Sequence, residues 1–294
     1  MTEKPTNVPA SVRQRLLNRA RAEGRVFQEL ATLYAMERFL YRLAASDEVD
    51  RFVLKGGLMT LTWAGEFARV TRDIDLLRSG SATPEAVVEA IRAVLLATVG
   101  DDGVVFDAAS AIGEAITVDA AYMGTRVRFT ADLAGMVLHL QTDVGVGDAV
   151  VPAPQWVEYP QLLDFGSPRL LGYPPEATIA EKLHAVCYLG LANSRLKDYY
   201  DFWTAARTGV CTPKSLGLAI RHTFARREQP LPTDLPEGLS PAFADSAEKR
   251  AQWAGFLRKS RLTAPPLDEV VRVAAELARP AFEIARTRSK TEES

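Results

Sequence analysis

The stretch KGGLMTLTWAGEFARVTRDIDLL, residues 55–77, joins a glycine pair to an apolar segment and then to two acids, Asp73 and Asp75. Successive side chains of a β-strand point to opposite faces, so on a strand both acids lie on one face while Ile74 points into the core. Two carboxylates suit Mg²⁺, which keeps several waters and is usually completed by substrate phosphates. The stretch therefore predicts a magnesium site, with Mn²⁺ as the alternative ion.

The glycine pair predicts the phosphate end of the same site. Gly56 and Gly57 follow Lys55 and precede an expected helix over residues 58–64. Glycines let a backbone approach a phosphate closely, and the free N–H groups at a helix N-terminus attract negative charge. A lone Gly-Gly is usually a turn and a lone Asp-x-Asp a solvated strand end. Their order in one stretch favours a joint site for a triphosphate and its metal ion.

Two segments of this stretch, VLKGG at 53–57 and RVTRDIDLL at 69–77, resemble the signature of the nucleotidyltransferase-fold superfamily. They resemble in particular the AbiEii and MenT toxins of type IV toxin–antitoxin systems. The resemblance implies an α+β fold in which helices flank a nucleotidyltransferase-like mixed β-sheet lobe. An all-helical C-terminal lobe follows, with the active site in the cleft between the lobes. Nucleotide-binding roles are expected for Lys55, Gly56, Gly57 and Arg72.

The resemblance also implies an activity, which is transfer of a nucleotidyl group from an NTP to an acceptor hydroxyl with loss of pyrophosphate. For the MenT-like toxins the acceptor is the 3′ end of tRNA. Addition of nucleotides there would block aminoacylation and hence translation. A cognate antitoxin protein would counter the toxin.

Bulk composition is typical of a soluble globular protein, and the chain is expected in the cytoplasm. Its 294 residues are enough for one large or two medium domains, and its net charge is −2. The two cysteines, Cys187 and Cys211, lack metal-ligand spacing, so zinc is not expected. The N-terminus has no apolar signal region, and no apolar run approaches the roughly 20 residues that cross a bilayer, so no membrane partner is expected.

Hydrophobic periodicity predicts a β-containing domain over residues 1–165 and a helical domain over 166–294. Strands are expected at 52–54, at 70–77 and repeatedly between 103 and 151, and none after about 165. The helices expected are 9–24, 26–46, 84–99, 176–191, 198–208, 213–227, 240–259 and 267–288.

A third carboxylate is expected at the end of an apolar strand, at Asp143. In a two-metal site such an acid bridges the second ion or takes the proton of the attacking hydroxyl. Asp132 and Asp148 compete for this role on sequence grounds, and a strand-end turn would also explain an acid here. The family pattern places an acid at the end of such a strand, which favours Asp143.

Two motifs of the helical part complete the predicted site. Lys182, in EKLHA, is either a surface lysine whose stem covers apolar residues or an ammonium that neutralises a triphosphate. Its resemblance to the family's helical lysine motif favours the second role. RLKDYYD at 195–201 resembles the family's R-x-K-D-x-x-D motif, which makes Asp198 a site residue and Arg195 and Lys197 nucleotide-binding residues. Asp201 and His184 receive no assigned role.

The sequence offers two candidate surfaces for the acceptor. Residues 249–290 hold ten Lys or Arg against four acids, a net of +6, which indicates either a solvated helix face or an RNA surface. The arginines between Arg13 and Arg25 are the alternative. Two other functions keep the same motifs, namely modification of a small molecule or protein, and partner binding with catalysis lost. The presence of all five expected catalytic residues, Asp73, Asp75, Asp143, Lys182 and Asp198, argues against lost catalysis.

Overall fold

The computed structural model describes residues 7–67, 69, 71–80, 83–118, 122–147 and 150–287. The chain divides into two compact units. The first comprises residues 1–62, 70–148 and 155–172, and the second comprises residues 63–69, 149–154 and 173–294. The sequence suggested a single boundary at residue 165, whereas the chain passes repeatedly from one unit to the other. Among the described residues, no helix has both the length and the apolar character needed to cross a membrane.

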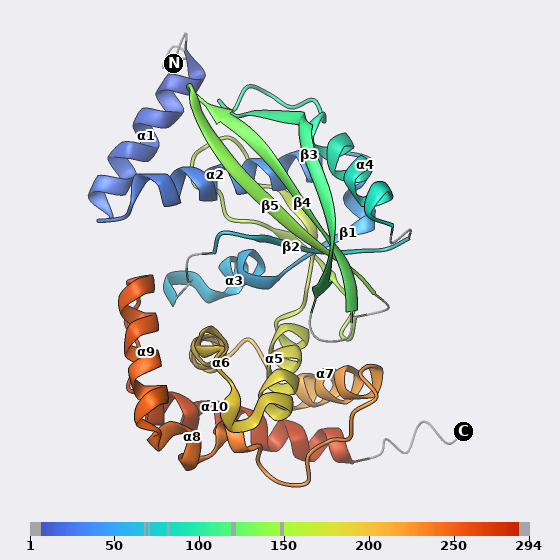
Figure 1. Cartoon of the computed structure of the whole chain (residues 1–294), viewed down its shortest axis with the longest axis vertical. Helices are drawn as coiled ribbons and strands as arrows, with labels where there is room; N and C mark the ends of the chain where they lie inside the picture. Colours follow the sequence, from blue (N-terminus) through green and yellow to red (C-terminus); the bar gives the residue numbers. More distant parts are fainter. Residues whose placement is uncertain are drawn as a thin grey trace. The chain divides into compact units, whose positions relative to one another are not determined.

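A mixed β-sheet forms the centre of the first unit (Figure 1), as the sequence predicts. Its described strands are β1 (Phe52–Lys55), β2 (Ile74–Arg78), β3 (Val105–Val118), β4 (Tyr122–Leu133), β5 (Met136–Val146), β6 (Gln155–Glu158) and β7 (Arg169–Gly172). They run in the order β3-β4-β5-β2-β1-β7-β6, with parallel pairs β2–β5 and β1–β7. The expectation of no strand after residue 165 is wrong, because β7 forms by pairing with the distant β1.

Helices cover one face of this sheet (Figure 1), and the alternate burial of β5 residues marks the other face as open. The covering helices are α1 (Val8–Ala22), α2 (Phe27–Ala44) and α4 (Pro84–Leu95). Alternate residues of β5, such as Leu138 and Leu140, are buried on the covered side, where the rings of Phe39 and Phe129 stack at 5.3 Å. The residues between them on β5 point to the open face, which is where the predicted site residues of the sheet lie.

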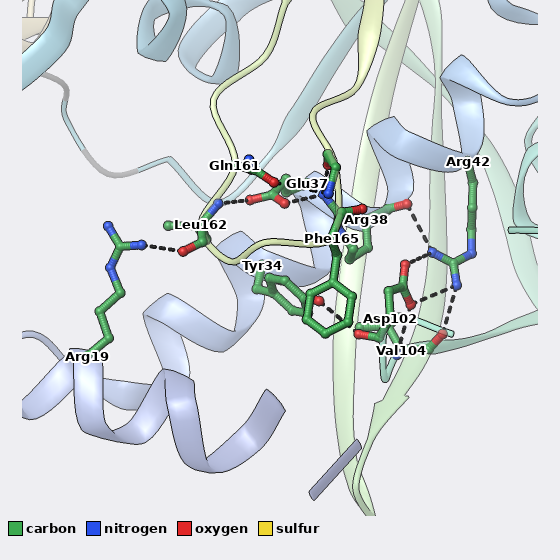
Figure 2. A network of polar contacts seen from close by, with 11 residues as sticks. Arg19, Tyr34, Glu37, Arg38, Arg42, Asp102, Val104, Gln161, Leu162 and Phe165 are labelled. Atoms are coloured by element: carbon green, nitrogen blue, oxygen red, sulfur yellow. Dashed lines mark hydrogen bonds and ion pairs between the residues drawn. The ribbon is translucent and has the colours of Figure 1, made fainter. Parts of the chain in front are cut away.

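A buried polar network ties helix α2 to the loop that precedes β7 (Figure 2). The Glu37 carboxylate accepts hydrogen bonds from the Arg38 guanidinium and from the Leu162 backbone N–H, the latter at 2.6 Å. Arg38 in turn donates to the Phe165 carbonyl at 2.9 Å. Neither charged side chain is accessible to solvent, and burial raises the pKa of Glu37 to about 7. The network therefore holds the loop against α2, and burial in it makes the Glu37 carboxyl harder to ionise.

The raised pKa of Glu37 makes folding stability depend on pH. From its ordinary value of 4.5 in the unfolded chain it rises to about 7, so the folded state keeps the proton longer. The folding stability that protonated Glu37 contributes is fully present below pH 4.5. It is lost as pH rises through 7, by up to about 3 kcal/mol. In urea unfolding at pH 5 and pH 8, Glu37→Gln should therefore gain stability relative to wild type at the higher pH. Exposed Glu276→Gln is the control, and an equal difference at both pH values for Glu37→Gln would contradict the assignment.

The second unit is helical in its described residues. Its helices are α5 (Pro175–Leu189), α6 (Leu196–Thr208), α7 (Pro213–Arg226), α8 (Pro241–Asp245), α9 (Ala247–Ser260) and α10 (Leu267–Arg286). The single helix expected over 240–259 is wrong. Ser246 interrupts it with an extended backbone conformation (φ −60°, ψ 121°), and its hydroxyl accepts from the Lys249 N–H at 3.4 Å to cap α9.

An early segment of the chain, residues 63–69, is part of this helical unit. Trp63 and Phe67 pack against its apolar core, and the Phe67 ring meets the edge of Trp203 with ring centroids 5.2 Å apart. This segment follows the glycine pair and precedes Asp73 in sequence. The signature stretch therefore contributes residues to both units.

Candidate active site

One row of charged residues crosses the open face of the sheet. Strand register places Lys55 of β1 opposite Asp75 of β2, Asp75 opposite Asp143 of β5, and Asp143 opposite Arg126 of β4. Residues directly opposite one another have side chains on the same face, with Cβ atoms about 5 Å apart. The row therefore reads cation, carboxylate, carboxylate, cation across four strands.

Gly56 allows the Asp75 side chain its place in this row. Helix α3 (Gly56–Ala64) begins directly after β1, two residues earlier than expected. Gly56 has φ +67°, and a Cβ on it would lie 1.8 Å from Oδ2 of Asp75. Both the backbone conformation and the close carboxylate therefore require glycine. Gly57 is buried in the first turn, and its carbonyl accepts from the Thr60 hydroxyl at 2.7 Å. Phosphate binding by the two glycines stays a prediction.

Replacing Gly56 by Ala should displace the Asp75 carboxylate. We expect a loss of about 1–3 kcal/mol of stability and at least a tenfold loss of transfer activity. Gly24 is a matched control, since its φ is +62° and its Cβ would meet nothing within 4 Å. Gly24→Ala carries the backbone strain without the clash. Thermal unfolding and activity of both variants separate the two effects, and equal behaviour would contradict a specific role for the Asp75 contact.

The two acids of the Asp-x-Asp motif have different surroundings. Strand β2 begins at Ile74, so Asp73 immediately precedes it, is exposed, and accepts a hydrogen bond at Oδ1 from Nε2 of Gln141 at 2.7 Å. Asp75 is half-buried within the strand. No three His, Cys, Asp or Glu side chains in the described part of the chain are grouped to hold a metal ion. The metal-ligand roles assigned to Asp73, Asp75 and Asp143 stay predictions.

Asp143 is engaged by an arginine of the next strand. Nε and Nη2 of Arg126 donate to Oδ1 and Oδ2 of Asp143, each at 2.7 Å, in a two-pronged ion pair. The side chains are 30% and 17% exposed respectively, and hydrogen bonding to Asp143 raises the pKa of Arg126. Of the competing acids, Asp132 makes a turn bond to the Gly135 N–H at 3.0 Å, and Asp148 lies outside the described residues.

A surface pocket of about 580 Å³ adjoins Asp73 on the same face. Its lining includes Arg72, Asp73, Ile112, Arg128, His139 and Gln141. Arg72 is 73% exposed and pairs with Glu29 at 3.0 Å, and Arg128 pairs with Glu114 at 2.6 Å. The lining thus combines hydrogen-bond donors with an exposed apolar side chain, Ile112.

The helical unit holds the second group of predicted residues. The Lys182 ammonium of α5 donates to the Asp198 carboxylate and lies 3.0 Å from Oδ2 of Asp201, both on α6. The Lys182 side chain is 12% exposed and both acids are buried. Burial by itself would lower the pKa of Lys182, but the two carboxylates more than offset this and raise it. The lysine is therefore a largely buried cation held by two carboxylates rather than a surface residue.

Two arginines also pair with these acids, and Lys197 precedes Asp198 on α6. Nε of Arg195 lies 2.9 Å from Oδ2 of Asp198, and Arg69 forms a two-pronged pair with Asp201 at 2.8 and 3.1 Å. Burial, together with the charges of Lys182 and Arg69, lowers the pKa of Lys197. Lys182, Arg195 and Arg69 thus all pair with the two carboxylates of α6.

Each of the two groups lies within one unit. The first contains Lys55, Gly56, Gly57, Arg72, Asp73, Asp75 and Asp143, and the second contains Lys182, Arg195, Lys197 and Asp198. Their meeting in a single site stays a prediction.

Three residues were missed by sequence reasoning. Gln141 could have been found, because it stands two residues before Asp143 and so shares its face. Arg126 follows only from the register of β4 against β5. Arg69 stands at the start of the quoted RVTRDIDLL segment, but its partner Asp201 is 132 residues away.

Several cations of the basic stretch at 249–290 are engaged in contacts within the protein. Lys249 is buried and donates to the Asn193 carbonyl at 2.8 Å, while Arg250 and Arg272 form ion pairs. Arg286 donates to two backbone carbonyls, and Arg288 and Lys290 lie outside the described residues. The N-terminal alternative is also partly engaged, since Arg15, Arg19 and Arg25 pair with acids.

Comparison with known proteins gives the class of protein. The family model for the nucleotidyl transferase AbiEii toxin of type IV toxin–antitoxin systems matches residues 38–286. The protein is thus a nucleotidyltransferase, and the chain belongs to the AbiEii toxin family, which confirms the resemblance seen in the sequence.

Two solved structures resemble the chain at low sequence identity. JHP933 from Helicobacter pylori is 12% identical, with 88% of this chain and 93% of that chain covered and a TM-score of 0.49. An H. pylori protein described as a candidate nucleotidyltransferase is 14% identical, with coverage of 88% and 95% and a TM-score of 0.44. A search of curated proteins found no match.

Proposed function

We propose that the protein is the toxin of a type IV toxin–antitoxin system and transfers a nucleotidyl group to RNA, with the 3′ end of tRNA as acceptor. The acceptor hydroxyl oxygen forms a bond to the α-phosphorus of the NTP. The bond from that phosphorus to the bridging oxygen breaks, and pyrophosphate leaves with the electron pair. The hydroxyl proton passes to a base or to water. Extension of the tRNA end then blocks translation until the cognate antitoxin counters the toxin.

The row of charges on the sheet supports phosphoryl chemistry. Asp73 and Asp75 offer the hard oxygen ligands that Mg²⁺ or Mn²⁺ prefers, and exposed Asp73 leaves room for water and phosphate oxygens in the remaining positions. When bound, such an ion neutralises phosphate charge in the transition state. Gly56 keeps the space that the Asp75 carboxylate occupies. Lys55 stands opposite Asp75 on the neighbouring strand and balances its charge before substrate binds.

The cluster of basic side chains around Lys182 supports the proposal for an NTP substrate. Arg69, Lys182 and Arg195 gather at Asp198 and Asp201, and Lys197 stands next to Asp198 on the same helix. Clustered lysine and arginine side chains are the groups that bind and neutralise a polyphosphate in phosphoryl-transfer sites. The acids hold the lysine in place while the half-buried Arg195 guanidinium keeps contact with solvent.

The pocket beside Asp73 supports a nucleic-acid acceptor. Arg72 and Arg128 can contact a backbone phosphate, and exposed Ile112 offers an apolar surface to a base. A terminal nucleotide seated there has its hydroxyl next to the predicted metal site. The pocket replaces the 249–290 stretch as the acceptor surface in this proposal, because that stretch is partly buried and paired.

The deciding experiment incubates the purified protein with total RNA, Mg²⁺ and each α-labelled NTP in turn. We expect label from one or more NTPs in RNA of tRNA size on a denaturing gel. RNA whose 3′ ends have been oxidised with periodate before the reaction should take up no label. If label appears only on a protein or on a small molecule, then that molecule is the acceptor and RNA is not. If no NTP transfers label to any of these acceptors in a cell extract, the proposed transfer is wrong and the fold serves binding alone.

A further inference from the structure

The ion pair between Arg126 and Asp143 has a direct bearing on the number of metal ions. A second ion in a phosphoryl-transfer site needs a third carboxylate, and Asp143 is the acid that the strand register places beside Asp75. Both oxygens of that carboxylate already accept hydrogen bonds from a single guanidinium at 2.7 Å. A divalent ion on Asp143 would therefore lie next to a fixed positive charge.

The guanidinium is built into the sheet rather than reaching in from a distant loop. Arg126 stands directly opposite Asp143 in the antiparallel pairing of β4 with β5. A planar fork meeting a carboxylate with two parallel bonds is the strongest form of this ion pair. A guanidinium stays protonated throughout the physiological pH range, so Arg126 keeps its charge beside Asp143. The cation is therefore a constant feature of the site.

Asp73 and Asp143 differ in what their carboxylates contact. Among the described residues, Asp73 accepts from the neutral amide of Gln141, is exposed and forms no ion pair closer than 4 Å, whereas Asp143 is neutralised by Arg126. The other nitrogen of the Arg126 fork, Nη1, donates to no described protein acceptor. It is free to donate to an oxygen of a substrate phosphate.

We propose that Arg126, oriented by Asp143, takes the place of a second metal ion, so that one divalent cation at Asp73 and Asp75 serves the site. The inference rests on the metal-dependent transfer proposed above. Asp143 is then a positioning residue, neither a metal ligand nor the base. Arg126 supplies fixed positive charge to the transferring phosphate, as an arginine does in other phosphoryl-transfer sites.

Electron paramagnetic resonance with Mn²⁺ as the probe tests this directly. Wild-type protein is saturated with a mixture of the four α,β-methylene nucleoside triphosphates, which cannot react, and then titrated with Mn²⁺. We expect one protein-bound Mn²⁺ per chain with the six-line spectrum of an isolated ion. Two ions about 4 Å apart would give a spin-coupled spectrum instead. A coupled pair in the wild type overturns the inference, whatever any variant does.

Two variants of Arg126 separate charge from structure. Arg126→Gln removes the charge and should raise the stoichiometry from one to two Mn²⁺, with a coupled spectrum, because Asp143 becomes free. Arg126→Lys keeps the charge and should stay at one, and Arg128→Gln, on the same strand and face, is the control that should also stay at one. A folded Arg126→Gln that stays at one ion overturns the inference. Absence of any bound Mn²⁺ in the wild type instead removes the proposed metal site itself, so the two failures are distinguishable.

Discussion

Replacement of Asp75 by Asn is expected to lower nucleotidyl transfer by about a thousandfold or more while leaving the fold intact. The amide has the shape of the carboxylate but neither its charge nor its affinity for a hard cation. Metal-assisted stabilisation of a transferring phosphate amounts to several kcal/mol, and each 1.4 kcal/mol is a factor of ten in rate. Asp75 is the acid that stands next to Asp143 in the charged row and against Gly56.

The assay for this variant is the transfer of label from an NTP to RNA at saturating Mg²⁺, with circular dichroism as the check on folding. Asp132→Asn is a matched control, since this acid lies on the same sheet but makes only a turn bond to Gly135. It should keep full activity. If Asp75→Asn transfers label at the wild-type rate and without metal, Asp75 has no role in metal binding or catalysis.

Lys182→Ala is expected to lose both activity and stability. Its ammonium holds two buried carboxylates, Asp198 and Asp201, and removal of one partner from a buried ion pair costs about 3 kcal/mol or more. The loss of charge facing a triphosphate should lower turnover by at least a hundredfold. Lys182→Arg should rescue poorly, because a planar fork does not fill the place of a compact ammonium.

A double variant separates the two losses. Lys182→Met combined with Asp198→Asn removes one charge of each sign, so stability in urea should recover most of what Lys182→Ala loses, whereas activity should not return. Exposed Lys214→Ala is the control for removing a lysine from the same unit. Unchanged turnover in Lys182→Ala would show that this lysine is structural only.

The sequence was sufficient for the parts of the fold that depend on local patterns. Alternation places Asp75 on the open face and Ile74 and Leu76 in the core, and both apolar side chains are fully buried. The mixed sheet and the helical C-terminal part are confirmed, and so is the nucleotidyltransferase family. The catalytic and binding roles stay predictions until the variants are measured.

What the sequence could not supply depends on long-range pairing. Strand β7 forms through its pairing with β1. The position of Arg126 opposite Asp143 is known only when β4 is aligned against β5. Arg69 likewise lies near the acids in sequence but pairs with Asp201 of α6. Local periodicity carries no information on which distant strand or helix a residue meets. The break at Ser246 was missed for a different reason, because a serine in a helical pattern is only weakly unfavourable.

The path of the chain bears on how the toxin is degraded in a cell. A cut after residue 172 would release a helical fragment that lacks Trp63, Phe67 and Arg69. Its core would be open at Trp203, and Asp201 would lose its arginine partner. No single proteolytic cut therefore yields an intact helical unit, and limited digestion should destroy the protein as a whole rather than liberate a stable half.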